Sequence, residues 1–128
     1  MRNKCLVLLL VPSLIVLSGC LFWDWAPPPL DPPSNLVATA VSCDQIHLSW
    51  QDNSVDEDYF RVLCPTMWGI QHITIATLPP DTTSFDHRNL EPEKEYEYYV
   101  CAHRRGEGGS EEHTCSERVY ATTPACVA

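Results

Sequence analysis

Two cysteines and two histidines near the end of the chain have the side-chain types and spacing of a metal or redox site. They form the motifs Cys101-x-His103 and His113-x-Cys115. The two motifs are mirror images about Gly108, so antiparallel pairing of the two segments would bring all four side chains together. Two sulfur and two nitrogen ligands can hold zinc in a tetrahedral site. The same cysteines can instead form a disulfide bond, which suits a protein outside the reducing cytosol.

A second group of candidate ligands is the acidic cluster that follows Trp50, namely Asp52, Asn53, Asp56, Glu57 and Asp58. Clustered oxygens suggest calcium, but their spacing lacks the Asp-x-Asp-x-Asp-Gly pattern of a calcium loop. A solvated turn is therefore the favoured interpretation. Nucleophile-elbow, zinc-protease, phosphate-loop and dinucleotide motifs are all absent from the sequence. We expect no enzymatic activity and no cofactor.

Residues 1–19 have the three parts of an export signal: basic Arg2 and Lys4, an apolar stretch, and small residues before a cleavage point. The apolar stretch is shorter than the roughly 20 residues that span a bilayer, which argues against an uncleaved anchor. Its end, Leu17-Ser18-Gly19-Cys20, resembles the lipobox of bacterial lipoproteins. The alternative is an ordinary secretory signal with a cysteine at this position.

The lipobox resemblance implies cleavage before Cys20 and attachment of a lipid to its thiol. Two or three acyl chains make such an anchor stable. The expected location is the cell membrane or the outer membrane, with the domain exported from the cytoplasm. Residue 21 is Leu rather than Asp, which resembles an outer-membrane address in Gram-negative bacteria.

Cleavage would leave 109 residues with 6 basic and 17 acidic side chains, a net charge of −11. This length allows one domain with a single core. So acidic a chain has no electrostatic footprint for nucleic acid, and charge cannot hold it on anionic lipid. Membrane attachment must therefore be covalent or hydrophobic.

Residues 20–33 are predicted to form a tether, because Pro27-Pro28-Pro29 and Pro32-Pro33 favour polyproline II at about 3.1 Å per residue. Trp23 and Trp25 could lie in the headgroup region or belong to a plain linker. The domain is expected over 34–124, followed by a tail at 125–128. Within the domain, short alternating runs predict seven strands at 36–41, 46–50, 60–62, 73–75, 84–86, 96–102 and 119–121. The fold class is therefore all-β, a two-sheet sandwich.

Several of these runs resemble a fibronectin type III domain, an immunoglobulin-like sandwich, over about Pro32 to Pro124. The segments that carry the resemblance are Pro33-Ser34-Asn35-Leu36, Leu48-Ser49-Trp50, Phe60-Arg61-Val62, Leu90-Glu91-Pro92 with Tyr96, and Val119 to Pro124. The resemblance implies that Trp50 is the core tryptophan of the second strand. It also implies that Leu90, Pro92 and Tyr96 form a tyrosine corner. The five cysteines after Cys20 depart from the family pattern, and no Arg-Gly-Asp motif is present.

The strand directions of such a sandwich place Cys101 and Cys115 at one end and Cys43, Cys64 and Cys126 at the other. We expect a Cys101–Cys115 disulfide and one pair among the other three, with Cys43–Cys126 favoured and Cys64 left free. His103 and His113 would then be solvated neighbours of the first disulfide. Zinc at Cys101, His103, His113 and Cys115 is the competing interpretation.

The expected function is a lipid-anchored binding or spacer module of the cell envelope, without catalytic activity. It would meet an envelope protein or glycan through its loops or a sheet edge, above all Gln51 to Asp58 and His103 to Thr114. The alternative is an accessory subunit of an envelope enzyme or transport complex. We expect contact with the membrane through the lipid anchor and none with nucleic acid.

Overall fold

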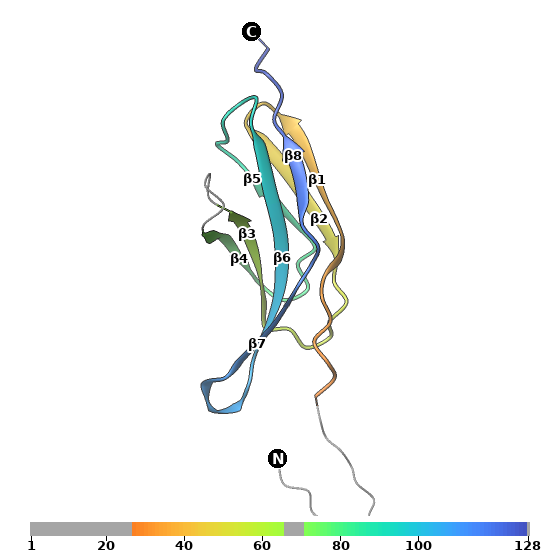
Figure 1. Ribbon diagram of the computed structural model, residues 1–128. Coiled ribbons are helices and arrows are strands. Elements are labelled where there is room, and N and C mark those ends of the chain that lie inside the picture. The colour runs from red at the N-terminus through yellow and green to blue at the C-terminus, as the bar shows by residue number, and fades with distance from the viewer. Residues whose placement is uncertain (1–26, 66–70, 128) are drawn as a thin grey trace, which may run out of the picture.

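The computed structural model describes residues 27–65 and 71–127, which form two antiparallel β-sheets packed face to face (Figure 1). One sheet has the strand order β1 (Ser34–Ser42), β2 (Gln45–Gln51), β5 (Ser84–His87). The other has the order β4 (His72–Leu78), β3 (Tyr59–Pro65), β6 (Glu95–Arg105), β7 (Glu111–Cys115). A last strand, β8 (Val119–Thr122), also pairs with β6, and a 3-10 turn, η1 (Glu107–Gly109), closes the β6–β7 hairpin.

The core lies between the sheets and follows the alternation of each strand. Strand β2 buries every second residue, Ile46, Leu48 and Trp50. Strand β6 does the same across the sandwich with Tyr98, Val100 and Ala102. Because side chains in a strand alternate between the two faces, the residues between these positions lie on the outer faces. This confirms the all-β sandwich expected from the sequence.

The last strand differs from the single seventh strand predicted at 119–121. It is broken into β7 and β8, and both segments pair with β6. At the break, the Ser116 N–H donates to the Val100 carbonyl at 2.8 Å, and the Val100 N–H donates to Ser116 Oγ at 3.0 Å. The strands of the hairpin also extend into the loop expected from His103 to Thr114, since Arg104 pairs with Glu112 and Arg105 with Glu111.

Part of the predicted tether belongs to the folded domain, so the expected boundary at residue 33 is wrong. Leu30 is 8 % exposed and lies in the core cluster. The Asp31 N–H donates to Ser54 Oγ, and this hydroxyl donates back to the Asp31 carbonyl. The sequence did not predict this packing, because Leu30 is a lone apolar residue among prolines and a single residue cannot show the alternation of a strand.

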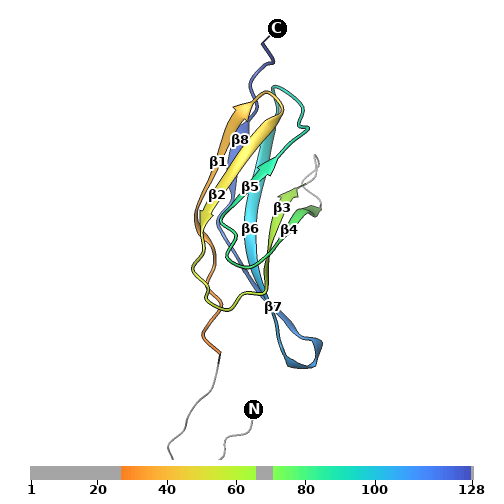
Figure 2. The ribbon, with the colours of Figure 1, turned by 180° about the vertical axis from the view of Figure 1, so that it is seen from behind.

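The chain enters at the end of the sandwich that carries the β2–β3 loop and the β6–β7 hairpin (Figures 1 and 2). We call this end the hairpin pole. The β1–β2 turn and the last residues lie at the opposite end, the C-terminal pole. No helix within 27–65 and 71–127 is long and apolar enough to cross a bilayer.

Candidate functional site

The β6–β7 hairpin brings the two Cys-x-His motifs together in the expected register. Cys101 lies opposite Cys115, and His103 lies opposite His113. The two sulfur atoms are joined in a disulfide, with Cα atoms 4.0 Å apart. The thiolates that the zinc interpretation requires are therefore consumed. The imidazole rings of His103 and His113 stack with centroids 5.2 Å apart.

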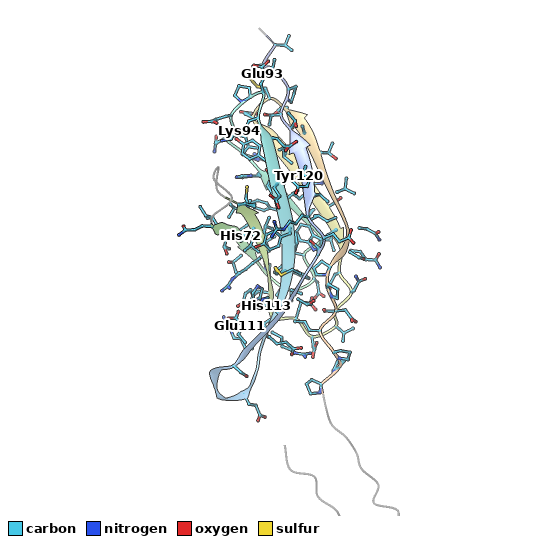
Figure 3. The ribbon with its side chains drawn as sticks, in the orientation of Figure 1. His72, Glu93, Lys94, Glu111, His113 and Tyr120 are labelled. Atoms are coloured by element: carbon cyan, nitrogen blue, oxygen red, sulfur yellow. A yellow bond between two sulfur atoms is a disulfide. The ribbon has the colours of Figure 1, made fainter. Side chains whose placement is uncertain are left out.

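The expectation that both histidines are solvated is wrong for His103. Figure 3 shows His113 and Glu111 along β7, where both are exposed. His103 is only 6 % exposed, because the Tyr59 ring stacks on it at 4.9 Å with an interplanar angle of 7°. Burial, together with the charges of Arg61 and His113, lowers the pKa of His103 to about 4. His103 is thus neutral at pH 7.

Glu111 is the acceptor around which these side chains are arranged. Its Oε1 lies 2.9 Å from His103 Nδ1 and accepts a hydrogen bond from the Tyr59 hydroxyl. Arg61 Nη1 lies 3.9 Å from the same oxygen. Because the Nδ1 side of neutral His103 faces a carboxylate, we assign the ring proton to Nδ1, which leaves the Nε2 lone pair as an acceptor.

Arginine side chains cover the tyrosine rings of the same outer face. The guanidinium carbons of Arg61 and Arg105 lie 5.1 and 5.6 Å from the Tyr59 centroid. Arg118 lies 5.5 Å from the Tyr99 centroid. Half of the 6 basic residues that follow Cys20 thus lie on one face of an acidic chain. We call this set the aromatic–arginine face; it comprises Tyr59, Arg61, Tyr99, His103, Arg105, Glu111, His113 and Arg118.

A shallow depression of about 280 Å³ lies in this face, lined by Arg61, Leu63, Tyr99, His103, Glu111, His113 and the Cys101–Cys115 disulfide. The Cys101–Cys115 disulfide cross-links the two strands that form its floor. A larger groove of about 440 Å³ lies between the first residues of β1 and the β7–β8 link. Its lining includes no His, Tyr, Trp or Arg. The depression on the aromatic–arginine face is therefore the better candidate for recognition.

The acidic β2–β3 loop is more ordered than a solvated turn. Asp56 accepts a 2.6 Å hydrogen bond from Arg104, whose side chain is 12 % exposed. Asp58 accepts the Arg105 N–H at 2.6 Å. These contacts hold the base of the hairpin against the loop, and Glu57 between them is buried.

The C-terminal pole contains the residues implied by the tyrosine corner. The Glu91 N–H donates to Tyr96 Oη at 2.9 Å, while Leu90 packs against the core and Pro92 is exposed. Trp50 is 5 % exposed, and its ring centroid lies 6.0 Å from that of Phe60. These residues shape the domain and line no depression described above.

Three cysteines and one histidine lie outside the aromatic–arginine face: Cys43, Cys64, Cys126 and His87. Cys43 and Cys126 form a disulfide, and Cys64 is free. Burial and the charge of Glu97 raise the pKa of the Cys64 thiol, which makes it a poor nucleophile at neutral pH. His87 is half-buried beside Tyr98, with its Nδ1 2.9 Å from the Tyr98 hydroxyl oxygen. Cys20, Trp23 and Trp25 lie outside the described residues.

Sequence reasoning missed Tyr59, Arg61, Tyr99 and Glu111. The first two alternate with buried Phe60 and Val62 along β3, so an outer-face assignment was available from the pattern. Their convergence on Glu111 depends on the register of three strands, which the sequence does not contain.

The chain matches the family model for the fibronectin type III domain over residues 31–117. A human collagen XX domain of this family is 25% identical and covers 77% of this chain and 99% of its own, with a TM-score of 0.57. The sixth such domain of human fibronectin type III domain containing protein 3 is 19% identical and covers 82% and 95%, with a TM-score of 0.61. A β-1,2-glucanase from Parabacteroides distasonis is 24% identical over 80% of this chain and 14% of its own, with a TM-score of 0.62.

Proposed function

Because the chain belongs to the fibronectin type III domain family, whose domains are generally non-catalytic modules, we propose that it is a binding module of the cell envelope. A lipid on Cys20 anchors it, and it binds an envelope protein or glycan through the aromatic–arginine face. The module has no catalytic activity of its own.

The observation that carries this proposal is the composition of that face, whose floor is cross-linked by the Cys101–Cys115 disulfide. Tyrosine rings offer flat apolar area at low entropic cost, and guanidinium groups recognise carboxylates in a fixed geometry. Arg61 and Arg118 lie on these rings beside the 280 Å³ depression. A partner that presents carboxylate and hydroxyl groups fits this combination. Neutral His103 adds an acceptor that does not repel a cationic or hydroxyl donor.

The anchoring part of the proposal rests on the leader and on the lipobox that ends at Cys20. Because the segment from Leu30 packs against the domain, only residues 21–29 separate Cys20 from the folded part of the chain. The tether joins the domain at the hairpin pole (Figure 1). An anchored domain would therefore direct this pole toward the lipid and present the aromatic–arginine face sideways, along the membrane.

The binding proposal is tested by cross-linked affinity capture from intact cells with the Arg61→Ala/Arg118→Ala double variant. Loss of two charge-assisted contacts predicts at least about tenfold less captured partner. Arg88→Ala is the matched control, because this arginine is exposed beside β5 in the other sheet. Equal capture by the wild type and the double variant would contradict the assignment of this face.

The anchoring proposal is tested with Cys20→Ala, which should move the protein from the detergent phase to the soluble fraction and abolish acylation. Unlipidated wild-type protein in the soluble fraction would refute it. The captured partner also separates the two functions. Capture of an enzyme or transport complex in a fixed stoichiometric ratio would favour the accessory-subunit alternative. Capture of a wall polymer or of a single receptor would favour the binding module.

A further inference from the structure

We propose that the hairpin pole contains a calcium site formed by the carboxylates of Asp52, Glu57 and Asp81. Each of these residues offers one carboxylate oxygen, and the three oxygens lie within 4.8 Å of one another. Two oxygens bound to the same Ca²⁺ at 2.3–2.6 Å are at most about 5 Å apart. The three side chains are thus already spaced as ligands of one ion.

The buried carboxylate of Glu57 is what distinguishes this cluster from ordinary surface acids. Glu57 is 5 % exposed. Its Oε1 accepts the Asp81 N–H at 3.0 Å, while its Oε2 is buried and has no hydrogen-bond partner among the described residues. A buried carboxylate oxygen without a partner is costly, and a cation at this position would satisfy it.

The charges around Glu57 point to the same conclusion. None of the three carboxylates takes part in a salt bridge within the part of the chain that the structure describes. Three carboxylate oxygens this close together repel one another when all three groups are ionised. Two arrangements can relieve this repulsion: a proton shared between Glu57 and Asp52, or a divalent cation among all three.

The two loops that supply the ligands are already tied together. Asp52 and Glu57 belong to the β2–β3 loop, and Asp81 belongs to the β4–β5 loop. The Trp50 N–H donates to the Thr83 carbonyl at 2.9 Å, which joins the bases of the loops. Because Asp81 comes from a distant segment, the spacing of the acidic cluster alone could not reveal this site.

Calcium fits better than magnesium, which requires a nearly ideal octahedron of ligands. Asp81 is exposed, so water can complete the irregular coordination of a larger ion. Extracellular modules with few protein ligands bind Ca²⁺ with dissociation constants of roughly 10⁻⁴–10⁻³ M. That range suits an exported domain.

The first test measures thermal unfolding of the purified full chain after EGTA treatment, with and without about 2 mM CaCl₂ at constant ionic strength. For a dissociation constant of about 10⁻⁴ M, the melting temperature should rise by roughly 5–10 °C. Glu57→Gln keeps the shape of the side chain and should abolish the rise. Glu107→Gln, in the exposed turn η1, makes the same change in net charge and should retain it.

Asp81→Asn guards against a folding defect in the first variant. Asp81 has φ 65°, a conformation that Asn tolerates. This variant should fold and bind Ca²⁺ at least about tenfold more weakly in calorimetric titration. The proposal is overturned if the wild type shows no response to Ca²⁺, or if Glu57→Gln responds like the wild type. A higher melting temperature of metal-free Glu57→Gln, combined with no Ca²⁺ response of the wild type, would show that Glu57 shares a proton with Asp52 instead.

Discussion

The two disulfides should contribute unequally to stability, and the difference can be calculated from the positions they join. Cys101 and Cys115 are 14 residues apart, whereas Cys43 and Cys126 are 83 apart. In the chain-entropy model, a cross-link stabilises by restricting the unfolded chain, and the effect grows with the logarithm of the loop length. The shorter loop gives about 3 kcal/mol and the longer one about 4.5 kcal/mol.

Both values are large beside the 5–15 kcal/mol of a typical domain. The comparison requires that each bond be opened without changing any packed side chain. We therefore suggest two variants that each retain a single disulfide. Cys64→Ala/Cys101→Ala/Cys115→Ala keeps the long loop, and Cys43→Ala/Cys64→Ala/Cys126→Ala keeps the short one. Removal of Cys64 in both prevents thiol exchange.

Each variant is unfolded in urea in its oxidised form and again after reduction. The loss of unfolding free energy on reduction should be about 1.5 kcal/mol greater for the variant that retains Cys43–Cys126. Equal losses, or a greater loss for Cys101–Cys115, would refute the entropic reasoning. Such a result would mean that the short disulfide acts mainly on the folded hairpin, through the packing of buried Cys101 against its neighbours.

Three further predictions concern the core, the tyrosine corner and the buried histidine. Trp50→Ala should lower the unfolding free energy by about 3–5 kcal/mol, and a change below about 1 kcal/mol in urea denaturation would contradict its core position. Tyr96→Phe should cost about 1 kcal/mol, because the Glu91 N–H loses its acceptor; the same assay tests it, with Tyr120→Phe as an exposed control. The pKa of His103 is lowered from 6.5 to about 4, so the unfolded state binds more protons between these values and stability should fall as the pH drops through this range, by up to about 3 kcal/mol. His103→Gln should remove that part of the pH dependence, and an unchanged profile between pH 7 and 4 would contradict the burial argument.

The strands that the sequence predicted well are those in which alternation reflects burial. In β2 and β6 one face is apolar, so a period of two identifies both the strand and its core side. The hairpin extension was missed for a related reason. Charged residues are depleted in strands, and Arg104 to Glu112 therefore reads as a loop. In the structure, opposite charges lie across the ladder at Arg104↔Glu112 and Arg105↔Glu111, an arrangement that stabilises strand pairing.

The candidate sites were predicted less completely, because they depend on contacts between separate strands and loops. The motifs at 101–103 and 113–115 were visible, but the burial of His103 requires Tyr59 from β3 to stack on it. Glu57 stood in a visible acidic cluster, but Asp81 approaches it from 24 positions further along the chain. The spacing of residues within one segment can reveal ligands that this segment supplies by itself. Both of these groups instead form when the fold brings distant segments together.

Arg104 connects the parts of the hairpin pole that the sequence presents as separate segments. Its guanidinium donates to the Pro28 carbonyl at 2.7 Å, to Asp56 at 2.6 Å and to Glu112 at 2.7 Å. The packed end of the tether, the acidic loop and the hairpin therefore share one largely buried cation. Asp56 directly precedes Glu57 in the sequence, so the carboxylate cluster of Asp52, Glu57 and Asp81 lies next to the residue that binds Arg104. Substitution of Arg104 would therefore remove the hydrogen bonds to Pro28, Asp56 and Glu112 at once and loosen the contacts among these three segments.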